Sequence, residues 1–261
     1  MADIQYLGHA CFRLRGRDGI VITDPYDRSI GLDLGRPTAH IVTVSHHHPD
    51  HNNVAAVRPV RDRVMVIDGP GEYEVGGVLI TGVRTFHDKN RGAELGRNTV
   101  YVIHLDDIVF CHLGDLAHEL TAQQLEEIGS VDVLFVPVGG GETIGPAEAA
   151  SVISQIEPHI VIPMHYAVEG LAGMNLAPLD RFLHELGIKD YTPEERLSLN
   201  ASNLPEDGEQ TRVVVTSVRP RSSGCSSNTP GASGVRASSA VVTPSAARAR
   251  SPTAFCHIRP V

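Results

Sequence analysis

Four histidines and one aspartate fall within residues 46–51, directly after the apolar run Ile41–Val44. Read as H-x-H-x-D-H, this segment offers four candidate metal ligands, which are His46, His48, Asp50 and His51. Neutral imidazole is the commonest metal ligand in proteins, and a carboxylate beside it suits zinc, manganese or iron. The alternative is a solvated histidine-rich loop that binds metal weakly. One loop cannot surround a metal ion, so a real site requires ligands from elsewhere in the chain.

Three later residues stand just past apolar stretches, where the end of a strand could hold a side chain rigidly. They are His87 after Val78–Val83, Asp115 after Ile108–Cys111, and His165 after Ile160–Ile162. A single histidine at a strand end is more often structural. Three such residues downstream of the histidine loop make coincidence a poor explanation, and we expect them to join the loop residues at one site.

Two residues near the N-terminus also end expected strands. His9 follows Gly8 in the first turn, and Asp24 precedes Pro25 at the end of the third strand. The alternative for Asp24 is a turn residue that hydrogen-bonds to nearby backbone. The alternative for His9 is a turn histidine with no role in a site.

The pattern of apolar runs predicts an α+β protein with two mixed sheets and helices outside them. Alternating or apolar runs between glycine-rich turns predict strands, at Ile4–Leu7, Cys11–Leu14, Ile20–Thr23, Ile41–Val44, Val64–Ile67, Tyr73–Val75, Val78–Val83, Asn98–His104, Ile108–His112, Val131–Pro137, Ile160–Ile162 and Arg212–Val218. Capping and glycine-stop signals predict helices, at Thr121–Ile128, Pro146–Glu157 and Pro178–Leu186, with a short one around Val54–Arg58.

Composition narrows the classes of function. After Pro220 the chain has five arginines and no acidic residue. Because the whole chain has a net charge of −9, the first 220 residues carry −9 − 5 = −14. Such an acidic body disfavours nucleic acid as a partner, because nucleic acid binds basic surfaces. No apolar stretch is long enough to span a membrane, and the N-terminus lacks a secretory signal, so we expect a cytoplasmic protein.

The 261 residues divide by composition. Residues 1–220 are expected to form one domain with a buried core. From residue 221 onward serine, alanine, proline and arginine dominate and apolar periodicity disappears, which predicts a low-complexity, disordered tail over 221–261.

The ordered series of motifs resembles the metal-dependent hydrolases of metallo-β-lactamase fold, and within them the L-ascorbate-6-phosphate lactonase-like branch of small bacterial hydrolases. The resemblance covers residues 1 to about 170. It rests on Leu7-Gly8-His9, Asp24-Pro25, the His46–His51 loop, Phe86-His87, His112-Leu113-Gly114-Asp115, Val136-Pro137-Val138-Gly139, Gly145-Pro146-Ala147-Glu148 and Pro163-Met164-His165-Tyr166.

The resemblance implies an αββα sandwich with two divalent metal ions at one edge, zinc as first choice and manganese or iron as alternatives. It assigns His46, His48 and His87 to the first metal and Asp50, His51 and His165 to the second, with Asp115 bridging them. Asp50 could also orient the nucleophile. Asp24 is expected to brace the histidine loop, and His9 and His112 to lie near the site, toward metal ligands or substrate.

Two metals that share a hydroxide would cleave a small polar or anionic substrate, with a lactone or ester as first choice. A phosphodiesterase or nuclease could use the same metals, although the acidic body and the short chain between Asp115 and His165 disfavour a nuclease. A third hypothesis is a non-catalytic, metal-binding regulatory protein. The intact ligand set disfavours it, and the sequence leaves substrate identity and oligomeric state open.

Overall fold

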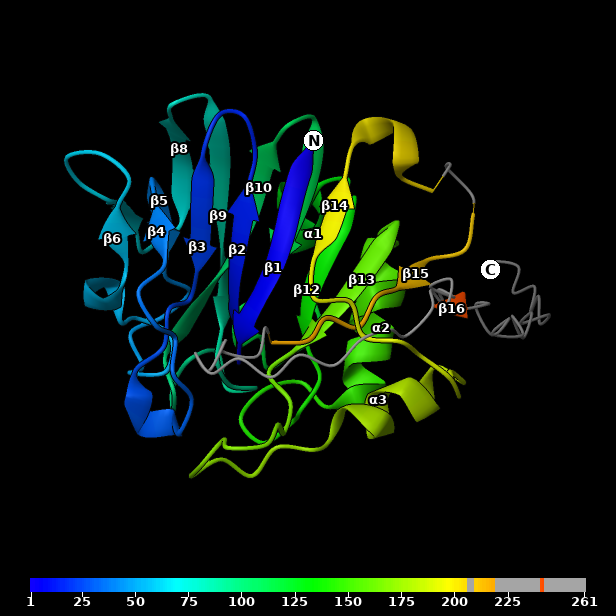
Figure 1. Ribbon diagram of the computed structural model, residues 1–261. Helices are drawn as coiled ribbons and strands as arrows, with labels where there is room; N and C mark the ends of the chain where they lie inside the picture. The colour runs from blue at the N-terminus through cyan, green and yellow to red at the C-terminus, as the bar shows by residue number, and fades with distance from the viewer. Residues whose placement is uncertain (206–208, 219–239, 242–261) are drawn as a thin grey trace, which may run out of the picture.

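Two mixed β-sheets pack face to face in the computed structural model, which describes residues 1–205, 209–218 and 240–241 (Figure 1). The six-stranded sheet has the order β14-β1-β2-β3-β5-β7, with bounds Leu197–Leu199, Ala2–Gly8, Cys11–Arg15, Ile20–Thr23, Ile41–Thr43 and Met65–Ile67. The eight-stranded sheet has the order β16-β15-β13-β12-β11-β10-β9-β8, with bounds Ala240–Val241, Arg212–Val213, Ile160–Met164, Val133–Pro137, Ile108–His112, Arg97–Leu105, Val78–Phe86 and Gly71–Val75. The expected α+β sandwich is confirmed.

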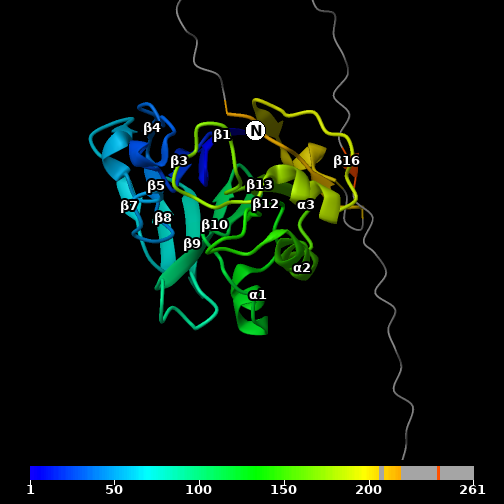
Figure 2. The same ribbon diagram turned by 90° about the horizontal axis from the view of Figure 1, so that it is seen from below.

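The three α-helices of the described residues lie on the outer face of the eight-stranded sheet (Figure 2). They are α1 (Ala122–Ile128), α2 (Pro146–Ile156) and α3 (Leu179–Glu185). The outer face of the six-stranded sheet is covered instead by two 3-10 turns and the short pair β4 (Thr38–Ala39) and β6 (Arg58–Pro59). No helix in the described part of the chain has the length and hydropathy that a membrane span requires.

The prediction of a helix over Val54–Arg58 is wrong. Only Val54–Ala56 forms a 3-10 turn, its N-cap residue Asn53 makes no side-chain cap, and none of its residues is buried. A segment of this length without a cap or an apolar face gains too little to form an α-helix.

Other local predictions survive with shifted ends. The capping box at Thr121 is present at the start of α1, and the β10–β11 hairpin turns at Asp106 and Asp107, whose φ angles of 54° and 62° suit a tight hairpin. The last expected strand is shorter, since β15 ends at Val213. The sequence patterns missed β14 and a third 3-10 turn, Ala201–Asn203.

The core between the sheets is apolar and aromatic. Phe12 from β2 and Phe135 from β12 meet there with ring centroids 4.3 Å apart. A second apolar cluster fills the space between the eight-stranded sheet and the helices. Cys11 and Cys111 are buried and free, as expected of small apolar residues.

Six strands deliver candidate site residues to the same end of the sandwich. β3 runs parallel to β5, and β1 has the same direction because two antiparallel steps separate it from β3. In the other sheet β11, β12 and β13 are parallel, and β9 shares their direction through β10. The ends of β1, β3, β5, β9, β11 and β13 therefore gather at the lower end in Figure 1.

The tail predicted for 221–261 lies outside the described residues except at Ala240–Val241. These two residues form β16, which pairs antiparallel with β15. Disorder of the remaining tail and the domain boundary at 220 stay predictions.

Candidate metal centre

Asp24 holds the histidine loop from beneath. Its side chain is fully buried. Oδ1 accepts the Ser45 backbone N–H at 2.8 Å, and Oδ2 accepts the Ser45 hydroxyl at 2.6 Å and the His51 Nδ1–H at 2.9 Å. Asp24 is thus hydrogen-bonded to residues at the start and at the end of the loop.

These hydrogen bonds decide which ring nitrogens face the site. His51 donates through Nδ1, which leaves the lone pair on Nε2. The Ser45 hydroxyl gives its proton to Asp24, so its oxygen accepts the Nδ1–H of His46 at 2.9 Å. In their neutral forms His46 and His51 therefore both present an unprotonated Nε2, the form in which imidazole binds metal.

Four imidazoles converge on a single carboxylate oxygen, Oδ2 of Asp115. The Nε2 atoms of His51, His87 and His165 lie 3.3, 3.3 and 3.4 Å from it, and that of His46 lies at 3.9 Å. These histidines come from both sheets. Asp115 therefore lies at the centre of the histidine cluster.

The side chains form two groups that could each hold an ion. His46, His48 and His87 offer ligand atoms within 4.8 Å of one another. A second group, also within 4.8 Å, contains His9, Asp50, His51 and His165. His46 and His51 further group with Asp115, which joins the two.

Several buried polar atoms in this cluster have no hydrogen-bond partner among the described residues. Their positions show whether a cation would fit the cluster. They are Nε2 of His51, Oδ1 of Asp115 and Nδ1 of His9, His87 and His165. An unpaired buried polar atom is unfavourable. The His51 Nε2 lone pair faces carboxylate oxygens of Asp50 and Asp115, each at 3.3 Å, an arrangement that a cation between them makes favourable. The residues fit a metal centre.

The pKa values agree with this chemistry. Burial, together with the neighbouring imidazole of His165, lowers the pKa of His9 to about 4, and burial with His51 lowers that of His46 to about 3. Both rings are neutral at pH 7. Burial also acts to lower the pKa of His51, but Asp115 and the other carboxylates around it outweigh burial and raise it. The site thus stabilises positive charge among its carboxylates.

Asp115 is positioned by a residue that the sequence analysis missed. Asn98 on β10 is fully buried. Its Oδ1 accepts the Asp115 backbone N–H at 3.0 Å, and its Nδ2 donates to Leu113 O at 2.9 Å and to Thr85 Oγ1 at 2.7 Å. No motif marks an asparagine inside a strand for this role, because it depends on the turn that folds back over β10.

His112 also acts on the backbone. Its Nε2 donates to Ala10 O at 2.8 Å, and its Nδ1 accepts the Gly114 N–H at 3.2 Å. Both ring nitrogens are used, so His112 braces the turn before Asp115 and has none left for a metal. His9 lies at the site, with Nε2 3.1 Å from Asp50 Oδ2, and it groups with Asp50, His51 and His165. His47 is exposed and belongs to neither group.

Three site residues adopt left-handed backbone conformations. The φ angles of His9, Asp24 and His165 are 56°, 38° and 52°. Such conformations cost energy in residues other than glycine and persist where the surrounding structure holds them. Gly139 permits the tight packing at His165, because a Cβ there would lie 2.2 Å from His165 O.

Comparison with known proteins agrees with this geometry. Residues 3–165 match the Beta-lactamase superfamily domain. A UPF0173 metal-dependent hydrolase of Thermococcus onnurineus is 30% identical over 191 residues, which cover 64% of this chain and 85% of that protein. A UPF0173 metal-dependent hydrolase of Methanoculleus marisnigri is 32% identical over 198 residues, covering 68% and 87%.

A solved structure extends the likeness. A proposed Zn-dependent hydrolase of the metallo-β-lactamase superfamily from Thermotoga maritima has 40% sequence identity and a TM-score of 0.67. The alignment covers 83% of this chain and 98% of that one.

Two packed mixed sheets with a histidine–aspartate cluster at their shared end define a metal-dependent hydrolase of metallo-β-lactamase fold. The domain match spans more than half of the chain, and the relatives agree with it. This chain belongs to the β-lactamase superfamily and, within it, to the UPF0173 metal-dependent hydrolases.

Proposed function

We propose that the cluster binds two divalent metal ions and hydrolyses a small polar ester or lactone. His46, His48 and His87 would hold one ion and Asp50, His51 and His165 the other, with Asp115 between them. The observation that carries this proposal is the convergence of four Nε2 atoms on Asp115 Oδ2, flanked by one ligand group on each side. Zinc is our first choice, and manganese and iron accept the same nitrogen and oxygen ligands.

Two bound ions would supply a water nucleophile at neutral pH and polarise the substrate carbonyl. The protein's own side chains would position a carboxylate beside the attacking water. Asp50 accepts a hydrogen bond from the His9 ring at 3.1 Å, and although burial raises its pKa, its contacts with His51 and His9 outweigh burial and lower it. Its ionised carboxylate, partly open to solvent, can orient an attacking water. His9 in turn fixes Asp50.

Two other functions remain as alternatives. A phosphodiesterase or nuclease could use the same two ions, but the net charge of −9 disfavours nucleic acid. A non-catalytic metal-binding protein would keep the ions without turnover. The relatives reported above are named for metal-dependent hydrolysis alone, so the preference for a lactone or ester is part of the proposal.

Metal analysis of the purified protein tests the centre. We expect close to two transition-metal ions per chain, with His48→Ala and Asp115→Ala both losing metal and turnover. His47→Ala is the matched control, because His47 lies in the same loop with its side chain exposed. A wild-type protein that takes up no transition metal would refute the proposal.

A substrate panel then separates the reactions. Lactones, carboxylic esters, thioesters and bis(p-nitrophenyl) phosphate are offered to the metal-loaded enzyme. Ester or lactone turnover supports the first choice, rapid phosphodiester turnover alone supports the second, and metal uptake without any turnover favours the binding protein.

A further inference from the structure

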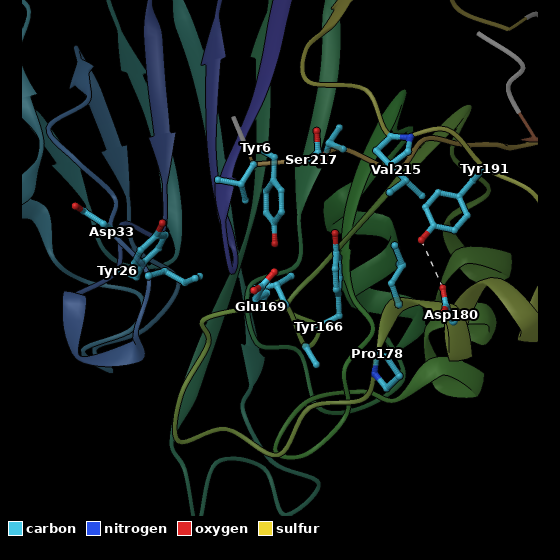
Figure 3. Close-up of a pocket in the computed structure, with 17 residues that line it drawn as sticks. Tyr6, Tyr26, Asp33, Tyr166, Glu169, Pro178, Asp180, Tyr191, Val215 and Ser217 are labelled. Atoms are coloured by element: carbon cyan, nitrogen blue, oxygen red, sulfur yellow. Dashed lines mark hydrogen bonds between the residues drawn. The ribbon is translucent and has the colours of Figure 1, made fainter. Parts of the chain in front are cut away.

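A cavity of about 510 Å³ is lined by residues that include Tyr6, Tyr26, Tyr166 and Tyr191 (Figure 3). None of the candidate metal ligands lines the cavity, but some of its wall residues contact His9, which belongs to the cluster. The hydroxyl of its wall residue Tyr6 donates to His9 O at 2.8 Å, and the ring of Tyr26 stands edge-on to the His9 ring at 6.4 Å. Tyr166, another wall residue, directly follows His165. A small molecule at the metal centre could therefore extend into this cavity.

The walls are rich in tyrosine. Four of the six tyrosines in the chain line the cavity, and they are Tyr6, Tyr26, Tyr166 and Tyr191. The rings of Tyr6 and Tyr166 lie 6.4 Å apart with 30° between their planes. Tyr6, Tyr26 and Tyr166 are buried, whereas Tyr191 is 40% exposed and offers an accessible aromatic face. Such a face carries negative electrostatic potential and attracts a quaternary ammonium group.

The charges around the cavity have the same sign. Glu169 and Asp180 lie at its exposed rim, with Asp180 Oδ1 3.5 Å from the Tyr191 hydroxyl. A third carboxylate, Asp33, pairs with Arg28 at 3.2 Å. No lysine or arginine is among the described residues that line the cavity. This potential attracts a cation and repels a sulfonate, phosphate or carboxylate.

A buried hydroxyl in the wall has no hydrogen-bond partner among the residues that the structure describes. Thr216, which follows β15, is 2% exposed and lines the cavity, and its Oγ1 makes no hydrogen bond. Buried polar groups are normally paired, so an unpaired one beside a cavity indicates a ligand that completes it. It supplies one directed hydrogen bond next to the aromatic walls.

We propose that this cavity is a substrate subsite for a compact cationic group, such as a quaternary ammonium, that carries a hydrogen-bonding oxygen. The substrate class is then a small ester or lactone with a cationic substituent, and anionic substituents are rejected. This inference rests on the proposed hydrolase function, since it names the substrate class of the same site.

Binding of three alcohols of similar size tests the subsite without hydrolysis. Choline carries a trimethylammonium group, 3,3-dimethylbutan-1-ol replaces it with a neutral tert-butyl group, and isethionate carries a sulfonate. The chain has no tryptophan, so tyrosine fluorescence of the full-length, metal-loaded protein reports on the cavity directly. We expect choline to bind about threefold to tenfold more tightly than the neutral alcohol and isethionate not to bind. Equal binding of all three, or tighter isethionate binding, would overturn the proposal.

Variants locate the binding. Glu169→Gln with Asp180→Asn should remove most of the preference for choline over the neutral alcohol. Asp107→Asn is the control, because Asp107 is an exposed carboxylate in the β10–β11 turn at the other end of the molecule. A preference that survives the double change, or falls equally in the control, contradicts a role for the rim.

Thr216→Val separates a ligand role from a structural one. Removing an unpaired buried hydroxyl should leave Tm unchanged or raise it, while choline binding weakens about threefold or more. A lower Tm with unchanged choline binding would show that the hydroxyl serves the fold, and would overturn its part in the subsite.

Turnover distinguishes failure of the subsite from failure of the proposed function. The p-nitrophenyl esters of 3-(trimethylammonio)propanoate, 4,4-dimethylpentanoate and 3-sulfopropanoate differ only in the terminal group. We expect kcat/KM to fall in that order, mainly through KM. Turnover without charge preference refutes the subsite and supports the hydrolase. Ordered alcohol binding without any ester turnover does the reverse.

Discussion

Replacing Asp24 by asparagine should weaken metal binding without emptying the ligand set. An amide keeps one oxygen for the Ser45 N–H, but its NH₂ group takes the place of Oδ2, which accepts the His51 Nδ1–H at 2.9 Å. Two donors then face each other. His51 can relieve this only by moving its proton from Nδ1 to Nε2, the atom that faces Asp50 and Asp115.

The size of the effect follows from these contacts. A residue that orients a metal-bound histidine typically contributes about 10–100-fold to metal affinity, or about 1.4–2.7 kcal/mol. In the metal-free protein the Ser45 hydroxyl oxygen can accept from the new amide, so the hydrogen bond that is lost is the one from His51 to the buried carboxylate, at about 1.5–3 kcal/mol. Part of this is recovered, because a proton on His51 Nε2 can donate to Asp115. We therefore expect a larger change in metal affinity than in the stability of the metal-free protein.

Competition with a chromophoric chelator measures the affinity, and urea unfolding of metal-free protein measures the stability. The control is Asp132→Asn. Asp132 also accepts a histidine Nδ1, from His159 at 3.1 Å, and a backbone N–H, from Val109 at 2.7 Å, but at the opposite end of β12. The Asp132→Asn variant should leave metal affinity unchanged. Affinity within twofold of wild type in Asp24→Asn would refute the role of Asp24 in fixing His51.

Three further outcomes are expected. Burial raises the pKa of Asp106, but hydrogen bonds from the N-terminal ammonium and a backbone amide outweigh burial and lower it. Its stabilising contribution is then present above the unfolded pKa of about 3.9 and lost as pH falls through the lower folded pKa. Asp106→Asn should thus cost about 1.5–3 kcal/mol at pH 7 and much less at pH 2 in urea unfolding, with Asp107→Asn near neutral throughout. Gly139→Ala should destabilise by about 1–3 kcal/mol or more, because its Cβ meets a backbone oxygen at 2.2 Å, whereas Gly69→Ala meets nothing within 4 Å and should not. Asn98→Ala should cost about 2–4 kcal/mol and lower metal affinity, and a fully stable variant that loads metal normally would show that the turn after β11 holds itself.

His87, Asp115 and His165 could be expected at one place from sequence because each stands shortly after the end of a strand. Strand direction then brings His87, Asp115 and His165 to the end of the sandwich where the histidine loop lies. A local pattern is enough for such residues, since the backbone hydrogen bonds of each strand fix where its last side chain lies.

The roles that the sequence left open or missed depend on contacts between distant segments. His9 enters a ligand group because the β1–β2 turn takes a left-handed φ of 56°, which a sequence pattern does not specify. Asn98 contributes through hydrogen bonds to a turn reached only after the next strand. The Val54–Arg58 helix failed because apolar residues alone do not provide a surface to pack against.

The proposed ligands come from both halves of the sandwich. The histidine loop follows β5 of the six-stranded sheet, whereas His87, Asp115 and His165 follow strands of the eight-stranded sheet. Bound ions would therefore link the two sheets at this end of the sandwich. If the ions link the sheets, their exchange rate should depend on local opening between the two sheets at this end. Removing the ions with a chelator should make the two sheets more mobile relative to each other there.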